Sequence, residues 1–341
     1  MTKKLRRFGI FFILVLGITV LSICIQDLIT MRVSFGFIDL KGEYQIVPKY
    51  EYAQSFSDAY ALVKEGEKFG FIDTQGKIQI EPKLSLAYDF HEGYARCCDD
   101  EGNWGLIDKG GRIFLEPFNS LLYPFQEGLA GFYEKGKKGY MNTNGDVVID
   151  PIFDWIDLFY DGYAVAQLKD KRGFINRDGE FVIEPMFDQC KPFSEDLAAV
   201  EIDKKWGFIN SAGEIVIQPL YERVESYNCG FALIKDRNGK YGYINGSGEG
   251  AIEPIYEQAG SFSEGLAAIQ IAGKWGYINT KGTLVIKPQF DSAYGFSEGL
   301  ARVRISKKYG FINKNGGIVI KPSFYYAEDF IGGLSLVSIR N

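Results

Sequence analysis

The chain has 341 residues, of which 46% are apolar and 15% aromatic, with 40 glycines, 11 prolines and a net charge of −6. This apolar content excludes a disordered chain, and the abundance of glycine favours many turns and short strands over long helices. A single histidine, His91, leaves little room for histidine-dependent catalysis or zinc chemistry.

The N-terminal segment has the pattern of a membrane signal. Residues 1–7 form a basic cytoplasmic tail, and residues 8–25 contain no charge. At about 1.5 Å per residue, a helix over 8–25 is about 27 Å long, close to the thickness of a bilayer's hydrocarbon core. The positive-inside rule then places the chain after the short linker 26–33 outside the cytoplasm. We expect an uncleaved transmembrane signal anchor in the cytoplasmic membrane; a lipoprotein signal ending at Cys24 and a cleaved secretion signal are the alternatives.

The remainder of the chain is acidic. Residues 1–33 hold five basic residues and one acid, a charge of +4, so the −6 of the whole chain leaves −10 for residues 34–341. An acidic body is a poor partner for nucleic acid and for other anionic polymers. We therefore expect no nucleic-acid partner.

From residue 34 onward the sequence consists of nine copies of one unit of about 34 residues. In each copy a glycine is followed by a second glycine six residues later, a proline twelve residues later and an aromatic residue twenty residues later. The first glycines of the copies are Gly36, Gly70, Gly105, Gly139, Gly173, Gly207, Gly242, Gly276 and Gly310. The nine copies occupy 34–341 as one array and leave no room for a separate catalytic domain.

One well-preserved copy illustrates the structure expected in every unit. Its predicted elements are a strand over 206–210, a hairpin loop over 210–213, a second strand over 215–217 and a third over 230–234. Asn210 is expected to hold an Asx turn and Gly213 to take a positive φ. Pro219 is expected to end the second strand because it cannot donate to a ladder, and Gly207 to allow close approach of a neighbouring unit's ring. Each unit is therefore predicted to be a three-stranded meander.

A Trp-Gly pair precedes the first strand's apolar residues in three copies, at Trp104-Gly105, Trp206-Gly207 and Trp275-Gly276. With these pairs, the repeat resembles the bacterial WG-repeat family over residues 34–341. The resemblance implies a repeated structural scaffold and no defined activity.

The arrangement of the units follows from their size. A unit of this length cannot bury a core of its own, so neighbouring units must supply it. We expect an all-β, open solenoid or superhelix, because propellers usually have about four to eight four-stranded blades. A closed propeller-like ring is the alternative, since the chain starts at a first strand (35–39) and ends at a third strand (334–339), and these two strands could pair.

The phased polar residues predict turns rather than chemistry. The loop at Asn176 fails as a calcium loop because position 174 is Phe and position 185 is Pro. Seven units place an acid before a later small residue, and we expect these acids to serve turns or the backbone rather than catalysis. They are Asp58, Glu92, Glu127, Asp161, Glu195, Glu264 and Glu298. No metal or cofactor motif is present, and none is expected.

The cysteines leave several alternatives open. Cys97 is six residues from His91, but a nucleophilic pair would need a spatial contact. Cys97 and Cys98 should point to opposite faces of a strand, so that one is buried and one exposed. A disulfide between Cys190 and Cys229 would be allowed outside the cytoplasm.

Exposed aromatic rings are the remaining candidates for a ligand site. Phased rings are expected in the core, whereas rings outside the phase are the places to look: Tyr52, Trp155, Tyr160, Tyr325 and Tyr326. We expect a non-enzymatic, membrane-tethered, extracytoplasmic repeat protein that binds a protein or peptide partner of the envelope. The alternative is binding of cell-wall or surface carbohydrate by aromatic rings in a groove between units. A third hypothesis is an enzyme with unrepeated carboxylates, or Cys97 with His91, in one pocket.

Overall fold

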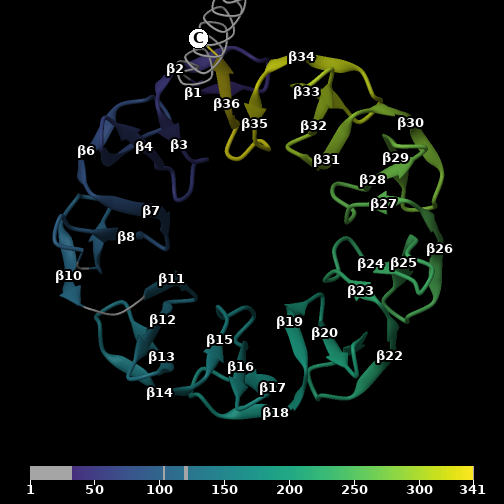
Figure 1. Ribbon diagram of the computed structural model, residues 1–341, viewed down its shortest axis with the longest axis horizontal. Coiled ribbons are helices and arrows are strands. Elements are labelled where there is room, and N and C mark those ends of the chain that lie inside the picture. The colour runs from purple at the N-terminus through teal and green to yellow at the C-terminus, as the bar shows by residue number, and fades with distance from the viewer. Residues whose placement is uncertain (1–32, 103, 119–121, 341) are drawn as a thin grey trace, which may run out of the picture.

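The computed structural model describes residues 33–102, 104–118 and 122–340, and every regular element in these ranges is a β-strand. The strands form nine sheets of four strands, which stand as blades in a closed ring (Figure 1). The predicted membrane segment 8–25 lies outside the described residues. Within the described part of the chain, no helix is long and apolar enough to cross a membrane.

Eight blades consist of four consecutive strands, the first innermost and the fourth outermost (Figure 1). The first four are β3 (Tyr52–Ala53), β4 (Ala61–Glu65), β5 (Lys68–Ile72), β6 (Ile78–Leu84); β7 (Leu86–His91), β8 (Tyr94–Cys98), β9 (Trp104–Asp108), β10 (Ile113–Phe118); β11 (Leu122–Gln126), β12 (Leu129–Glu134), β13 (Lys137–Asn142), β14 (Val147–Phe153); and β15 (Trp155–Ile156), β16 (Ala164–Leu168), β17 (Lys171–Ile175), β18 (Phe181–Phe187). The next four are β19 (Gln189–Ser194), β20 (Leu197–Ile202), β21 (Lys205–Ile209), β22 (Ile215–Tyr221); β23 (Arg223–Val224), β24 (Phe231–Lys235), β25 (Tyr241–Asn245), β26 (Gly250–Tyr256); β27 (Gln258–Ala259), β28 (Leu266–Ile271), β29 (Lys274–Asn279), β30 (Leu284–Phe290); and β31 (Ser292–Ser297), β32 (Leu300–Ile305), β33 (Lys308–Asn313), β34 (Ile318–Phe324).

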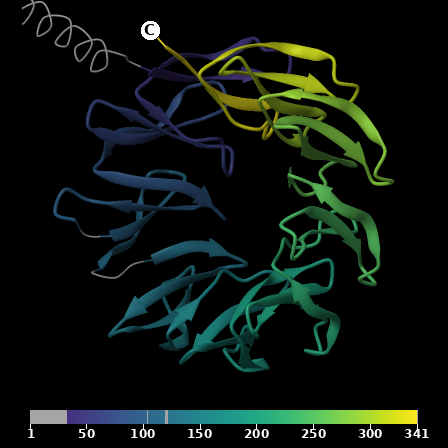
Figure 2. The same ribbon diagram turned by 45° about the vertical axis from the view of Figure 1, so that its right-hand side comes forward.

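The ninth blade joins the two ends of the described chain and closes the ring (Figure 2). Its order from the inside outward is β35 (Tyr326–Ala327), β36 (Leu334–Arg340), β1 (Val33–Asp39) and β2 (Tyr44–Tyr50). The strands β1 and β36 pair without a register break from Val33 opposite Arg340 to Asp39 opposite Leu334. The closed ring given as the alternative, and the pairing that was to seal it, are therefore confirmed, whereas the favoured open array is not found. Within the described residues, this pairing gives the strands at both ends of the array a partner.

Each unit contributes four strands, so the prediction of three was wrong. The missed strand lies in the excursion between the second and third predicted strands: β23 is two residues long and pairs with β24. The second strand also continues past Pro219 to Tyr221, with a register irregularity in its pairing to β21. Proline is tolerated there because β22 is outermost in its sheet and one of its edges needs no partner.

The core lies between blades rather than within them. Phe208 of one blade meets the phased Tyr227 of the next with ring centroids 4.9 Å apart. The same contact recurs, at 4.7–5.1 Å, in Phe37–Phe56, Phe71–Phe90, Tyr140–Phe159, Phe174–Phe193, Tyr243–Phe262, Tyr277–Phe296 and Phe311–Phe330. These rings are nearly or completely buried, which confirms that the phased aromatics form the core. Every blade thus depends on both neighbours for its apolar burial.

The structure explains the residue type at two positions of the repeat. A Cβ on Gly207 would lie 2.3 Å from the carbonyl oxygen of Ile217, so this glycine admits the outer strand of its own blade, not a neighbour's ring as expected. Asn210 Oδ1 accepts hydrogen bonds from the backbone N–H groups of Ala212 and Glu214, which confirms the Asx turn. Equivalent turns are held by Asp39, Asp73, Asp108, Asn142, Asn176, Asn245, Asn279 and Asn313.

Candidate binding sites

The phased acids tie neighbouring blades together. Glu92 accepts hydrogen bonds from the backbone N–H groups of Glu127 and Gly128, at 2.6 and 2.7 Å, in the following blade. Five others accept an N–H from the same position of the next blade: Asp58, Glu127, Glu195, Glu264 and Glu298. Asp161 occupies the same turn, with a positive φ. The prediction that these acids serve the backbone is confirmed for the six.

The structure does not bring His91 and Cys97 together. In the pairing of β7 with β8, His91 lies opposite Tyr94 while Cys97 lies opposite Ala87, four residues along the strand. The contact of His91 is Asp89, with Nε2 and Oδ2 3.2 Å apart. Burial raises the pKa of the Cys97 thiol to about 11, which disfavours the thiolate that a nucleophile needs.

The three other cysteines within the described ranges are also unpaired thiols. Cys98 is buried like Cys97, so the expectation that one of the two is exposed was wrong. Both faces of this strand are covered because neighbouring blades pack on each side of a sheet. Cys190 is buried and Cys229 is exposed; both are free, and no bridge joins them. The described residues hold no cluster of three or more potential metal ligands.

An unrepeated pair of carboxylates lies on the inner side of the closing blade. Glu328 accepts hydrogen bonds from Ser55 and Tyr326. Asp329 forms an ion pair with Arg302 at 3.3 Å. Burial raises the pKa of Asp329, an effect that Arg302 opposes and Glu328 reinforces.

The rings singled out from the sequence are partly exposed. Tyr52, Tyr325 and Tyr326 line a cavity of about 430 Å³ where the closing blade meets the first full blade. Trp155 is covered by the guanidinium of Arg172, 4.2 Å from its ring centroid. Tyr160 is exposed on the inner side of its blade. Three of the five rings therefore gather at one place, the seam of the ring.

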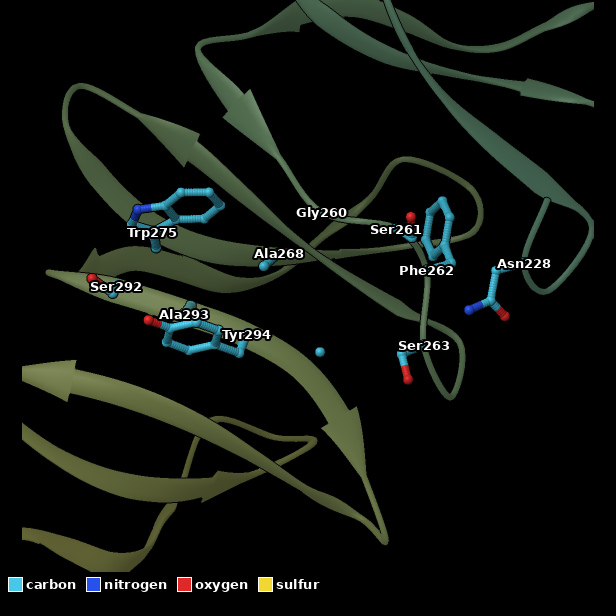
Figure 3. A pocket seen from close by; sticks show the side chains of 11 residues that line it. Asn228, Gly260, Ser261, Phe262, Ser263, Ala268, Trp275, Ser292, Ala293 and Tyr294 are labelled. Carbon is cyan, nitrogen blue, oxygen red and sulfur yellow. The ribbon is translucent and has the colours of Figure 1, made fainter. Parts of the chain in front are cut away.

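A second aromatic site lies between blades β27–β30 and β31–β34. Its cavity of about 510 Å³ has Trp275 on one side and Tyr294 on the other, with Ala268 between them (Figure 3). We call it the Trp275–Tyr294 slot. Trp275 comes from the start of β29, and Tyr294 from the innermost strand of the next blade.

Small residues keep this slot open. Ala268 takes the position that Arg96 and Arg302 occupy in two other blades. Gly260 stands where those two blades have Tyr88 and Tyr294. In the Arg96 blade the guanidinium lies 4.1 Å from the Tyr88 ring centroid and donates to a backbone carbonyl of the next blade. The slot therefore lacks the tyrosine and arginine side chains that stack in those two blades. Gly260 is the departure from the repeat, because every other unit has a larger residue there, whereas Gly131 and Ala199 are as small as Ala268 at its position.

Tyr294 is fixed before any ligand arrives. The guanidinium of Arg302 lies 3.8 Å from the Tyr294 ring centroid and donates to the carbonyl of Ala327 in the following blade. The hydroxyl of Tyr277 donates to the backbone carbonyl of Tyr294 at 2.8 Å. Burial raises the pKa of the Tyr294 hydroxyl, and its hydrogen bond with Tyr309 adds to the rise. Trp275 is half-buried and packs against the buried cluster that contains Phe290 and Phe296.

Reasoning from the sequence missed this slot. Trp275 is in phase with the repeat, and phased rings were assigned to the core. The signal was present in the small residues: Gly260 and Gly295 replace larger residues found at the same positions of all other units. Small residues mark an opening only when the register of adjacent blades is known, which required the structure.

The outer edge of the ring is uneven in character. On the eight outermost strands whose side chains are described, the positions three residues before, one before and one after the proline are exposed, apart from the half-buried Gln79. On four consecutive blades these positions are apolar or acidic, apart from the neutral Gln218. We call them the apolar–acidic arc: Val148, Asp150, Ile152; Val182, Glu184, Met186; Val216, Gln218, Leu220; Ala251, Glu253, Ile255. The same positions on the next blades and across the seam are Val285, Lys287, Gln289; Val319, Lys321, Ser323; Gln45, Val47, Lys49; and Gln79, Glu81, Lys83.

Comparison with solved structures shows the fold. The crystal structure of a eukaryotic initiation factor matches with a TM-score of 0.59 at 10% identity, covering 90% of this chain and 98% of that chain. Two others have lower scores: BamB from Moraxella catarrhalis (0.43, 8% identity, 84% and 95% covered) and the dihydro-heme d1 dehydrogenase NirN (0.46, 10% identity, 77% and 74% covered). No curated protein matches the sequence.

The family comparison covers nearly the whole ring. The model of the WG containing repeat matches nine consecutive segments: 35–69, 69–100, 104–137, 139–171, 173–206, 206–241, 241–275, 275–309 and 309–341. Each segment corresponds to one turn of the repeat described above. The chain therefore belongs to the WG-repeat family, and its nine repeats fold as a nine-bladed, propeller-like ring.

Proposed function

We propose that this protein is a non-enzymatic binding protein, tethered to the cytoplasmic membrane by residues 8–25, whose ring binds a protein or peptide partner outside the cytoplasm. The repeat fold supports a binding role, because repeat arrays present extended surfaces. The observation that carries the proposal is the apolar–acidic arc, which runs over four consecutive blades.

The arc exposes large apolar side chains on successive outermost strands. Ile152, Met186, Leu220 and Ile255 are 52–68% exposed, and they follow one another around the rim on β14, β18, β22 and β26 (Figure 1). Other blades with the same fold place Lys49, Lys83, Gln289 and Ser323 at this position. The fold therefore does not demand an apolar residue there. Apolar residues gathered on one surface, with polar residues around them, are typical of protein–protein contacts.

The chemistry of the arc indicates its partner. Asp150, Glu184 and Glu253 place acids between the apolar positions, and the arc's twelve positions hold no basic residue. A polypeptide segment that carries both basic and apolar side chains fits this pattern. Each outer strand also contains a proline, which lacks an N–H donor. The partner is therefore expected to bind through side chains rather than by adding a strand to a blade.

The test is cross-linking and co-purification of the full-length chain from native membranes. The double variant Met186→Lys, Leu220→Lys places lysine at two positions of the arc. Lys49 and Lys83 occupy the equivalent position of other blades, so the ring should fold. Gln289→Lys makes the same change outside the arc and is the matched control. We expect a specific protein to be retained by the native chain and the control but lost by the arc variant. If no protein is retained, or if the arc variant retains it equally, the proposed function is wrong.

A further inference from the structure

We infer that the Trp275–Tyr294 slot is a carbohydrate subsite that binds one neutral pyranose ring of a glycan. This site is separate from the apolar–acidic arc: the slot is lined from β28, β29 and β31 and the segments beside them, whereas the arc lies on the outermost strands β14, β18, β22 and β26. The inference does not depend on the partner proposed for the arc.

The two rings define the shape of the ligand. Figure 3 shows the Trp275 indole and the Tyr294 phenol ring on opposite sides of the slot, with the methyl group of Ala268 between them. Both rings are half-buried, so each retains an accessible surface. A flat ligand with C–H groups on its faces can contact both rings at once. The axial C–H groups of an equatorially substituted pyranose provide such faces.

The polar groups around the slot match hydroxyls rather than charges. The lining includes the hydroxyls of Ser261, Ser263 and Ser292 and the amide of Asn228, and none of the lining residues is charged. Ser263 donates to the carbonyl of Phe296 at 2.5 Å, which leaves its oxygen able to accept. Serine hydroxyls both donate and accept, as sugar hydroxyls do. An ionised ligand would find no opposite charge in the lining and would lose its hydration.

The size and rigidity of the slot also fit a small ring. A cavity of about 510 Å³ lies within the range of small-molecule pockets, about 300–1,000 Å³. Tyr294 is already held by Arg302 and by the backbone bond from Tyr277, so binding need not order it. Preorganised rings lose little conformational entropy when a ligand binds.

The test measures binding of three neutral tetrasaccharides, chitotetraose, cellotetraose and maltotetraose, to the full-length protein in detergent by isothermal titration calorimetry. Trp275→Ala removes one stacking ring. Ala268→Arg fills the slot with a side chain that two other blades carry at this position, so it keeps the inference testable if Trp275→Ala folds poorly. Trp206→Ala is the matched control, because Trp206 has the same repeat position beside Lys191, at 5.8 Å, rather than beside the slot.

We expect at least one tetrasaccharide to bind saturably, with an affinity about tenfold or more weaker in Trp275→Ala and Ala268→Arg and unchanged in Trp206→Ala. The inference is overturned if none binds at millimolar concentration, or if binding is insensitive to both slot variants. A decaproline peptide, which also stacks on aromatic grooves, is titrated in parallel. If it binds with this variant dependence while the saccharides do not, the slot is a peptide site.

Discussion

The glycine of the Trp-Gly pair offers the sharpest test of how a blade is packed. In Gly207→Ala the new Cβ would lie 2.3 Å from the carbonyl oxygen of Ile217 and 2.8 Å from backbone atoms of Gln218 and Pro219. The carbonyl must move by about 0.7 Å to restore even a 3.0 Å contact, and it belongs to backbone rather than to a flexible side chain. Overpacking of this kind costs about 1–3 kcal/mol, and we expect about 3 kcal/mol here.

At about 2 °C per kcal/mol for a chain of this size, Gly207→Ala should lower the thermal midpoint by about 6 °C in differential scanning calorimetry. The matched control is Gly250→Ala on β26, where a Cβ would meet nothing within 4 Å. That control should leave the midpoint unchanged or raise it slightly, because alanine restricts the unfolded chain. Equal midpoints for the two variants would refute the packing role assigned to Gly207.

Three further predictions concern turns, pH and closure. Asn210→Ala removes the acceptor of two backbone N–H groups and should cost about 1 kcal/mol in thermal unfolding; no change would mean that water replaces the turn. A backbone hydrogen bond from Arg112 holds the pKa of Asp108 below its ordinary value, so this stabilisation is present above about pH 3.9 and is lost as the pH falls through the lower folded-state pKa. Asp108→Asn introduces the residue found in six other units and should reduce the loss of stability as the pH falls below about 3.9 in an acid-unfolding experiment. An unchanged pH dependence of stability would contradict the role assigned to the Asp108 carboxylate. Val337→Asp places a charge at a fully buried position of β36 and should cost several kcal/mol; a minor loss of stability would show that closure by β1 and β36 contributes little.

Most of the repeated acids that were considered as catalytic candidates bond the backbone of the next blade instead, as Glu92 does. A residue that recurs in most units is expected to have a structural role that most units need. For Glu92 and its equivalents, this role is a hydrogen bond between adjacent blades. The residues that distinguish one blade from another lie elsewhere, at Gly260, Ala268 and along the outer strands. The sequence shows that these residues differ from those at the same positions of other units. It does not show which of them face one another across a blade interface.

The sequence by itself determined the unit: its length, its number, its Asx turns at residues such as Asn210, its buried phased rings and its family. These features are local or periodic, so the same residue pattern recurs in each of the nine copies and can be recognised without the structure. The tertiary structure alone decided that the array closes and which residues meet across a blade interface. Closure depends on the small rotation between successive blades, which accumulates over nine units before Val33 can pair with Arg340. The slot between Trp275 and Tyr294 likewise depends on that rotation, because it sets how far apart two rings in neighbouring blades stand.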